Sequence, residues 1–349
     1  MVRGYIGADN RNGSVLTTRI YLDHAATTPM RSEAIAAVAD GMARWANPSS
    51  PHAEGRAARR ALEDARARIA KALGWEGEVI LTSGASEALA IALKGHDAVA
   101  VSVEHDAVLR VVGSDRISVG GDGLVDPAQV PPGRRLAVQS ANSETGVLQP
   151  LADVAAKADV LVADCSQSAG KLPLPPADLI VVSAHKLGGP PGIGALLVRD
   201  FALLTPTGGQ EQGYRGGTEN VPGALGFAAA LEAPHEWFER TAILRHTLDD
   251  VVREHGGEVI ADASPRIPTI AAYRMPGRSA GAQLMRLDSA GFAVSAGSAC
   301  SSGTLKTSHV LTAMGIDAKA ASEVIRVSFG WTTTAHDVEH FAAAWRALA

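Results

Sequence analysis

Residues 160–198 read VLVADCSQSAGKLPLPPADLIVVSAHKLGGPPGIGALLV and hold three short apolar runs, Val160–Asp164, Leu179–Ser183 and Gly194–Val198. Short runs that are apolar throughout, instead of alternating with polar residues, are typical of strands covered on both faces of a sheet. The first run ends in Asp164, and the second continues into Ser183-Ala184-His185-Lys186 before a turn rich in glycine and proline. We therefore expect neighbouring buried strands that carry polar side chains at their carboxyl ends.

The same texture extends upstream of this stretch. Further apolar runs lie at residues 78–82, 98–102 and 135–140. Helical patterns between and before them cover residues 54–73, 86–93 and 151–158. Gly74 directly follows the longest of these, at the position where glycine often ends a helix. Such alternation of strands and helices predicts an α/β domain with a mostly parallel sheet.

The pattern changes after about residue 226, where long helical patterns with sparser strands begin. We expect an N-terminal tail at residues 1–19, a large domain at 20–226 and a small domain at 227–349 that carries Cys300. The first segment of the large domain is expected to pack with the small domain. The tail has no apolar core of the kind that a secretory signal peptide requires.

Composition narrows the function. The chain has 349 residues and a formal net charge of -5, and aromatic residues make up only 4%. It has no basic stripe with interleaved aromatics, so a nucleic-acid groove is not expected. No uncharged apolar stretch reaches the ~18 residues of a membrane span. The two cysteines, Cys165 and Cys300, exclude a disulfide scaffold and a four-cysteine zinc site and fit a reducing compartment. These features predict a cytoplasmic enzyme without nucleic-acid or membrane partners.

Asp164 and Lys186 are the first candidate site residues. The carboxyl ends of adjacent parallel strands lie at one edge of a sheet, where ligands bind in open α/β folds. An isolated Asp and Lys are commonly ordinary surface residues. Here the lysine closely follows a buried strand, and burying a lysine is costly unless it is covalently or electrostatically engaged. A lysine that forms a Schiff base with pyridoxal phosphate (PLP), with an Asp facing the pyridine nitrogen, is the pairing that this cofactor requires.

Such a cofactor also needs a phosphate site. Residues 82–87, TSGASE, run from a strand into a helix, where small residues and the helix N-terminus favour an anion. The same residues could instead form a plain capping box with Ser86 at the N-cap. Ser183 and His185, just before the lysine, would supply further donors.

His105 and Cys300 are candidates for proton transfer and nucleophilic attack. His105 follows the run at 98–102 and could stack on the cofactor ring at the same sheet edge, although a lone histidine is more often a satisfied surface or core residue. Cys300 lies in residues 295–304, SAGSACSSGT, which have little to bury and predict an exposed loop. An exposed thiol there favours a nucleophile, whereas Cys165, at a strand end, is typical of a buried apolar residue.

Together the motifs resemble those of the cysteine desulfurases of the class V aminotransferase group, which are PLP enzymes of fold type I. The matching segments are YLDHAATTP (21–29), NPSSPH (47–52), TSGASE (82–87), EH (104–105), ETG (144–146), DCSQSAGK (164–171), SAHK (183–186), RGGT (215–218), GSAC (297–300) and IRVS (325–328). The resemblance therefore spans most of the chain. It implies a large PLP-binding domain with a mostly parallel sheet of the seven-stranded type, flanked by helices, and a smaller α+β C-terminal domain.

The resemblance also implies residue roles. Lys186 would bind PLP covalently and move the substrate Cα proton, and Asp164 would keep the pyridine nitrogen protonated. Gln167 would contact the phenolic oxygen, and His105 would stack on the ring. The phosphate would be held by Ala85, Ser86, Ser183 and His185. Thr218 would reach the phosphate of the neighbouring subunit, which implies a homodimer. Asn47 and Arg326 would bind the substrate carboxylate, for which the planar guanidinium is suited.

The implied reaction converts L-cysteine to L-alanine and leaves the sulfur as a persulfide on Cys300. The sulfur would pass to an acceptor or to an iron–sulfur scaffold protein, because the loop resembles the long-loop subgroup linked to iron–sulfur cluster assembly. In that subgroup small residues and then a helix, here 309–314, follow the cysteine. No metal is implied in the resting enzyme, although Cys300 could transiently ligate a nascent iron–sulfur cluster.

Three features depart from the family pattern. Ser143 stands where members usually have a cofactor-facing asparagine, and Asn142 is the neighbour that could compensate. Ser86 stands where threonine is usual, a change that keeps the hydroxyl. The chain also ends at Ala349, whereas members commonly have a C-terminal extension that helps to dock the scaffold protein, so partner recognition is expected to differ.

Other functions fit parts of the pattern. A selenocysteine lyase, or another class V enzyme, would share the fold but would need no thiol at Cys300 to accept sulfur. A non-catalytic sulfur-relay subunit would not need an intact Lys186, Asp164 and His105. A nucleotide-binding Rossmann protein is disfavoured, because no Gly-x-Gly-x-x-Gly turn follows the first strand.

Overall fold

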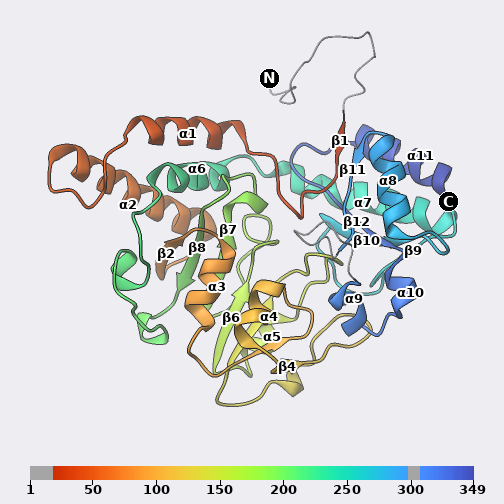
Figure 1. Cartoon of the computed structure of the whole chain (residues 1–349), viewed down its shortest axis with the longest axis horizontal. Coiled ribbons are helices and arrows are strands. Elements are labelled where there is room, and N and C mark those ends of the chain that lie inside the picture. Colours follow the sequence, from red (N-terminus) through yellow and green to blue (C-terminus); the bar gives the residue numbers. More distant parts are fainter. Residues whose placement is uncertain (1–18, 298–306) are drawn as a thin grey trace, which may run out of the picture.

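The computed structural model describes residues 19–297 and 307–349, and a seven-stranded sheet forms its larger part (Figure 1). In spatial order the strands are β2 (Glu78–Thr82), β8 (Gly194–Val198), β7 (Leu179–Ser183), β6 (Val160–Asp164), β5 (Arg135–Gln139), β3 (Ala98–Val101) and β4 (Arg116–Ile117). Strand β8 pairs antiparallel with β2 and β7, and the other neighbours are parallel. The predicted mostly parallel sheet is confirmed.

Helices cover both faces of this sheet (Figure 1). Strand β7 shows why the runs are apolar throughout: Ile180 and Val182 join one buried cluster, whereas Leu179 and Val181 join the other. The first cluster includes residues of α2 (Ala53–Leu73), α5 (Leu151–Ala155) and α6 (Val221–Glu232), with α1 (Ser32–Ala43) packed on α6. The second includes residues of α3 (Ala85–Leu93) and α4 (Asp106–Val112).

The C-terminal part forms a smaller unit beside the large sheet (Figure 1). Its antiparallel sheet has the order β12 (Val324–Ser328), β10 (Ile270–Arg274) and β9 (Glu258–Val259). Its helices are α7 (Glu236–Glu254), α8 (Ala280–Ser289), α9 (His309–Ala313), α10 (Ala318–Ala321) and α11 (Ala335–Leu348). Strand β1 (Ile20–Tyr21) pairs in parallel with β11 (Phe292–Ala293), so the first described strand lies against this unit.

The expected domain boundary at residue 226 falls inside α6. This helix packs against α1 and α2, and Phe227 and Ala230 belong to a core of the large sheet. We propose that the small domain begins after Glu232, where α6 ends.

Helix α2 shows how local sequence sets the ends of an element. At its start, Nδ1 of His52 accepts a hydrogen bond from the amide of Gly55 (3.2 Å), which satisfies one of the free N–H groups of the first turn. At its end, Gly74 adopts φ 65°, a left-handed conformation that glycine reaches without a Cβ clash. The predicted helix and its glycine stop are confirmed.

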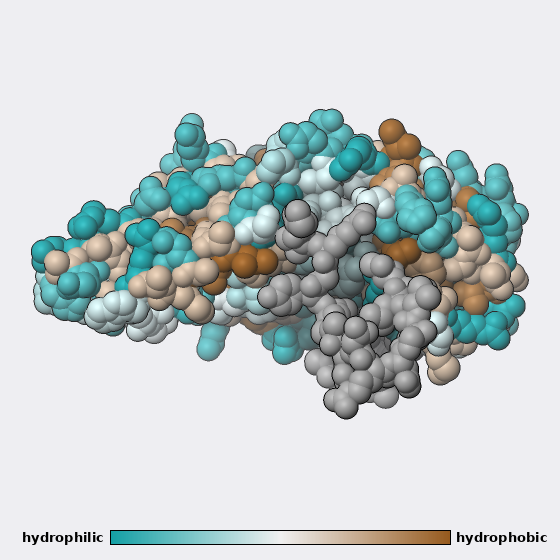
Figure 2. Space-filling model, turned by 90° about the horizontal axis from the view of Figure 1, so that it is seen from above, coloured by the Kyte–Doolittle hydropathy of each residue, from teal (hydrophilic) through white to brown (hydrophobic). Residues whose placement is uncertain are grey.

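The surface seen in Figure 2 is mainly hydrophilic, with apolar residues in small patches. Within the described ranges, no helix is long and apolar enough to cross a membrane. The exposed large apolar side chains of those ranges are Ile35, Met42, Trp45, Ile243 and Met285. The first three lie on α1 or directly after it.

Candidate active site

Asp164 and Lys186 lie at the carboxyl edge of neighbouring strands. Asp164 is the last residue of β6 and is in register with Val181 of β7, and Lys186 lies in a short 3-10 turn directly after β7. Lys186 Nζ donates hydrogen bonds to the backbone oxygens of Ala26 (2.8 Å) and Ala25. Gln167 Nε2 also donates to the oxygen of Ala25 (3.0 Å). The segment after β1 therefore meets both residues at this edge.

The charges around Lys186 tune its amine. Its pKa is lowered to about 8, mainly by burial and then by the positive charge of Arg326, against the opposing carboxylates of Asp164 and Asp23. A neutral amine is the nucleophile in Schiff-base chemistry. A lysine with a pKa of about 8 offers far more of it near neutral pH than an ordinary lysine does.

His105 begins α4 at the same edge of the sheet. Its Nδ1 accepts a hydrogen bond from the amide of Ala107 (3.1 Å), so the neutral ring carries its proton on Nε2. The pKa of His105 is lowered, mainly by loss of hydration, with Lys186 also lowering it and Asp164 raising it. The ring is solvent-accessible, yet it lies close enough to both charged groups to respond to them.

The N-terminus of α3 is free to hold an anion. Its N-cap is Gly84, and no side chain caps the helix, so Ser86 does not form the capping box that the sequence left open. The first amides of a helix have no intrahelical partner, which leaves Ala85 and Ser86 available. On the neighbouring strand end, Ser183 is buried, and burial together with Lys186 lowers the pKa of His185 to about 4, so the latter stays neutral.

Arg326 of β12 brings the small unit to this edge. Its Nη2 pairs with Oδ1 of Asp23 (2.8 Å), and its Nη1 donates to the backbone oxygen of Ser143 (2.9 Å). The residue is 7% exposed, and its charge reaches Lys186. A substrate carboxylate at Arg326 would therefore share or replace the contact with Asp23.

Asn142 does not compensate for the serine at position 143. Its Nδ2 donates to the oxygen of Val103 (3.1 Å), and its Oδ1 accepts from the amides of Glu144 and Thr145 (both 2.9 Å). The Asn142 side chain thus holds the turn. Ser143 contributes its backbone oxygen to Arg326, and its side chain is half-buried.

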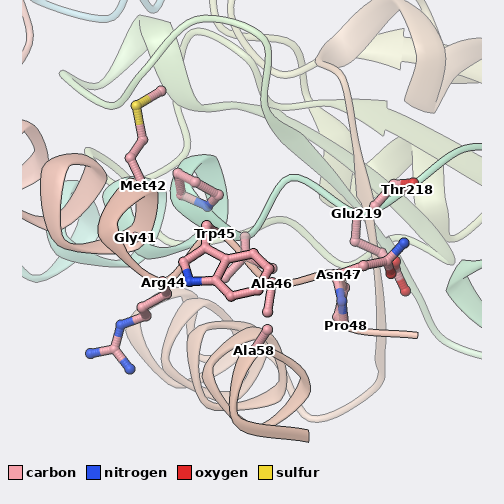
Figure 3. A pocket seen from close by; sticks show the side chains of 12 residues that line it. Gly41, Met42, Arg44, Trp45, Ala46, Asn47, Pro48, Ala58, Thr218 and Glu219 are labelled. Atoms are coloured by element: carbon pink, nitrogen blue, oxygen red, sulfur yellow. The ribbon is translucent and has the colours of Figure 1, made fainter. Parts of the chain in front are cut away.

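Asn47 and Thr218 lie elsewhere. Both line a cavity of about 410 Å³, together with Trp45 and Glu219 (Figure 3). The loop between α1 and α2, which carries Asn47, lies at the opposite end of the long axis from β12, which carries Arg326 (Figure 1). One chain therefore does not bring the two expected carboxylate ligands together.

Three groups at this edge had no assigned role in the sequence. Asp23 is the ion-pair partner of Arg326. Lys171 donates to the oxygen of Gln167 (2.9 Å), and burial followed by the charge of Lys186 lowers its pKa to about 7. Glu144 receives a hydrogen bond from Ser308 (2.6 Å). All three lie in or beside motifs that carry candidate residues, and this proximity was the only available signal.

The two cysteines differ in what the structure covers. Cys165 is fully buried, and burial raises its pKa to about 12, which confirms the prediction of an inert thiol. Cys300 lies outside the described residues.

The grouped residues fit a PLP-like cofactor. They offer an amine with a lowered pKa, a mostly buried carboxylate and free helix amides for a phosphate. Oδ1 of Asp164 accepts from the amide of Ser166 (2.9 Å), and the buried hydroxyl of Ser166 has no partner among the described residues. Such a donor and acceptor set matches a planar cation with an anionic arm.

Comparison with known proteins supports this interpretation. The family model described as aminotransferase class-V matches residues 20–341. An IscS-like cysteine desulfurase of Mycobacterium tuberculosis is 36% identical, over 91% of this chain and 93% of the relative. The structure of a NifS-like protein from Rickettsia africae superposes with a TM-score of 0.86 at 30% identity, covering 95% of this chain and 99% of the other. A structure of SspA in complex with cysteine has a TM-score of 0.77 at 28% identity, covering 88% and 98%. The chain belongs to the class V aminotransferase family.

Proposed function

We propose that this chain is a PLP-dependent cysteine desulfurase. The observation that carries the proposal is Lys186, with a pKa of about 8, at a sheet edge where the charges of Asp164 and Arg326 both act on it. The family relationship and the cysteine desulfurase names of the relatives support the same activity. A related protein was solved with cysteine bound.

PLP would be held by residues of this edge. Lys186 would bind it covalently, Asp164 would face the ring nitrogen, and His105 would stack on the ring. Gln167 would contact the phenolic oxygen. The phosphate would take its hydrogen bonds from Ala85, Ser86, Ser183 and His185. When bound, PLP supplies an electron sink that weakens the bonds at the α-carbon of an amino acid.

The protein groups would then act on the substrate in a defined order. Arg326 would bind the carboxylate of L-cysteine through its planar guanidinium, in exchange for part of its contact with Asp23. The free amine of Lys186 would take the Cα proton. Because its pKa is about 8, Lys186 can hold that proton and return it near neutral pH.

Sulfur transfer would follow at Cys300. Its thiolate would attack the substrate sulfur, so that an S–S bond forms while the C–S bond breaks and the electron pair passes to the substrate carbon. Protonation of that carbon gives L-alanine and leaves Cys300 as a persulfide. We propose that the persulfide sulfur then passes to an acceptor, such as an iron–sulfur scaffold protein, in the cytoplasm.

The proposal includes a homodimer in which Asn47 and Thr218 act across the interface. Both line the 410 Å³ cavity, distant from Arg326 of the same chain. The neighbouring side chains of Met42 and Trp45 are 68% and 79% exposed, and exposed apolar residues beside a cavity favour a protein interface. In a dimer these two residues would complete the site of the second subunit.

Alanine release from L-cysteine under a thiol reductant tests the function. The wild type and Cys165→Ala should both release alanine, because Cys165 is buried and inert. Cys300→Ala should release none while keeping its bound PLP. Release from Cys300→Ala at the wild-type rate would overturn the persulfide route, and no release from a PLP-loaded wild type would overturn cysteine as the substrate.

A further inference from the structure

The carboxylate of Glu144 touches both described stretches that flank residues 298–306. Its Oε2 accepts a hydrogen bond from Oγ of Ser308 (2.6 Å). On the other side it lies against Gly297, where an added Cβ would come within 2.0 Å of the same oxygen. Glu144 and Ser308 are only 6% and 4% exposed. The chain therefore leaves and returns to the described structure at one buried carboxylate.

The contact with Ser308 also fixes the start of a helix. Ser308 is the N-cap of α9, and its Oγ accepts from the amide of Leu311 (3.1 Å). A hydroxyl has one proton and two lone pairs, so donation to Glu144 leaves a lone pair free for the cap. A hydrogen bond from a buried hydroxyl to a carboxylate is stronger than one between neutral groups.

Glu144 is itself fixed to the catalytic edge. Its amide donates to Oδ1 of Asn142 (2.9 Å), and the preceding residue, Ser143, accepts from Nη1 of Arg326 (2.9 Å). The backbone of Arg326 is in turn bonded to Ser295, just before Gly297. The substrate-facing arginine and both flanks of residues 298–306 thus converge on one turn.

We propose that Glu144 is a positioning residue that anchors both flanks of the segment carrying Cys300 beside Arg326. The proposal rests on the desulfurase function proposed above. It adds that the sulfur-transfer step depends on a carboxylate that touches neither substrate nor cofactor. Fixed ends raise the effective concentration of a tethered group at its target, and loss of an anchor lowers it.

Kinetics of the PLP-loaded enzyme test the anchor. We expect Glu144→Ala and Ser308→Ala each to lower kcat for alanine release by roughly tenfold, the size of a lost charge-assisted hydrogen bond, with KM for cysteine within about twofold. The double variant should be no slower than either single variant, because both remove the same contact. Glu144→Gln keeps an acceptor oxygen and should restore most of kcat.

A matched pair elsewhere serves as the control. Ser32 Oγ donates to Oε2 of Glu33 (3.0 Å) on the exposed surface of α1. Ser32→Ala and Glu33→Gln should leave kcat unchanged. Equal losses in the two pairs, additive losses in the double variant, or an unchanged kcat in Glu144→Ala would each overturn the anchoring proposal.

Hydrogen–deuterium exchange separates this proposal from the function on which it rests. Amides of residues 308–313 should exchange faster in Glu144→Ala and Ser308→Ala than in the wild type, with no substrate present. Unchanged exchange would count against the anchor even if the wild type releases alanine. Faster exchange in a protein that releases no alanine would support the anchor and sink the desulfurase function alone.

Discussion

At the scale of single residues, the chemistry depends on how Arg326 and Lys186 share one environment. Two cations in a mostly buried edge repel, and the result is a lysine with a pKa of about 8. Asp23 lowers the cost of burying Arg326 by pairing with it at 2.8 Å, and it also favours the charged form of Lys186. The substrate carboxylate would therefore enter a site whose charges are already balanced.

The pH dependence of PLP capture tests this coupling. Only the neutral amine attacks the aldehyde, so the rate of PLP binding to the cofactor-free protein should rise with pH and level off above a midpoint near 8. Removing the cation in Arg326→Gln should move the midpoint upward. Arg44→Gln removes an exposed arginine that pairs with Asp40 and should leave the midpoint unchanged. A wild-type midpoint at the ordinary lysine value of about 10.4 would contradict the assignment.

Some site residues could be predicted from the sequence, because their position depends on local order. Asp164, His105 and Lys186 each follow an apolar run closely, and strands of one sheet bring such positions together. Asp23 and Glu144 could not be assigned in this way. Their partners are Arg326 and Ser308, 303 and 164 residues away, and no local period links residues at such separations.

At the scale of elements, strand runs were predicted closely because each strand is buried on both faces and ends at a polar residue or a turn. The domain boundary depends on packing instead. Helix α6 has a composition that fits either unit, and only its contacts with α1 and α2 place it with the large sheet. A pattern along the chain does not contain that information.

The close packing of α1 on α6 predicts the effect of a single methyl group. Gly41→Ala should raise helix propensity by up to about 1 kcal/mol, yet its Cβ would lie 2.6 Å from Cα of Pro222, a backbone atom of α6 that cannot move independently. We expect a net loss of roughly 1–3 kcal/mol in the free energy of unfolding, measured by urea denaturation. Ala36→Gly, on the exposed side of α1, reports propensity alone and should cost about 1 kcal/mol. A more stable Gly41→Ala protein would show that α1 and α6 can separate.

At the scale of the whole molecule, one chain holds two incomplete sets of site residues. Lys186, Asp164 and Arg326 meet at the sheet edge, whereas Asn47 and Thr218 line a cavity at a distance from Arg326. A twofold dimer places the same surface of each subunit against the other, so each cavity can supply the edge of the opposite subunit. The exposed Trp45 beside that cavity is then covered by the partner.

Mixing inactive subunits tests this arrangement. Lys186→Ala and Asn47→Ala chains, unfolded and refolded together, should form heterodimers in which the one remaining Lys186 receives an intact Asn47 from the other chain. Random pairing makes half the dimers mixed, so about a quarter of wild-type alanine release should return with the wild-type KM. Lys186→Ala mixed with Arg326→Ala is the matched control: Lys186 and the damaged Arg326 then share a chain, so activity should stay absent. Recovery in the control but not in the Asn47 mixture would place Asn47 in the site of its own chain.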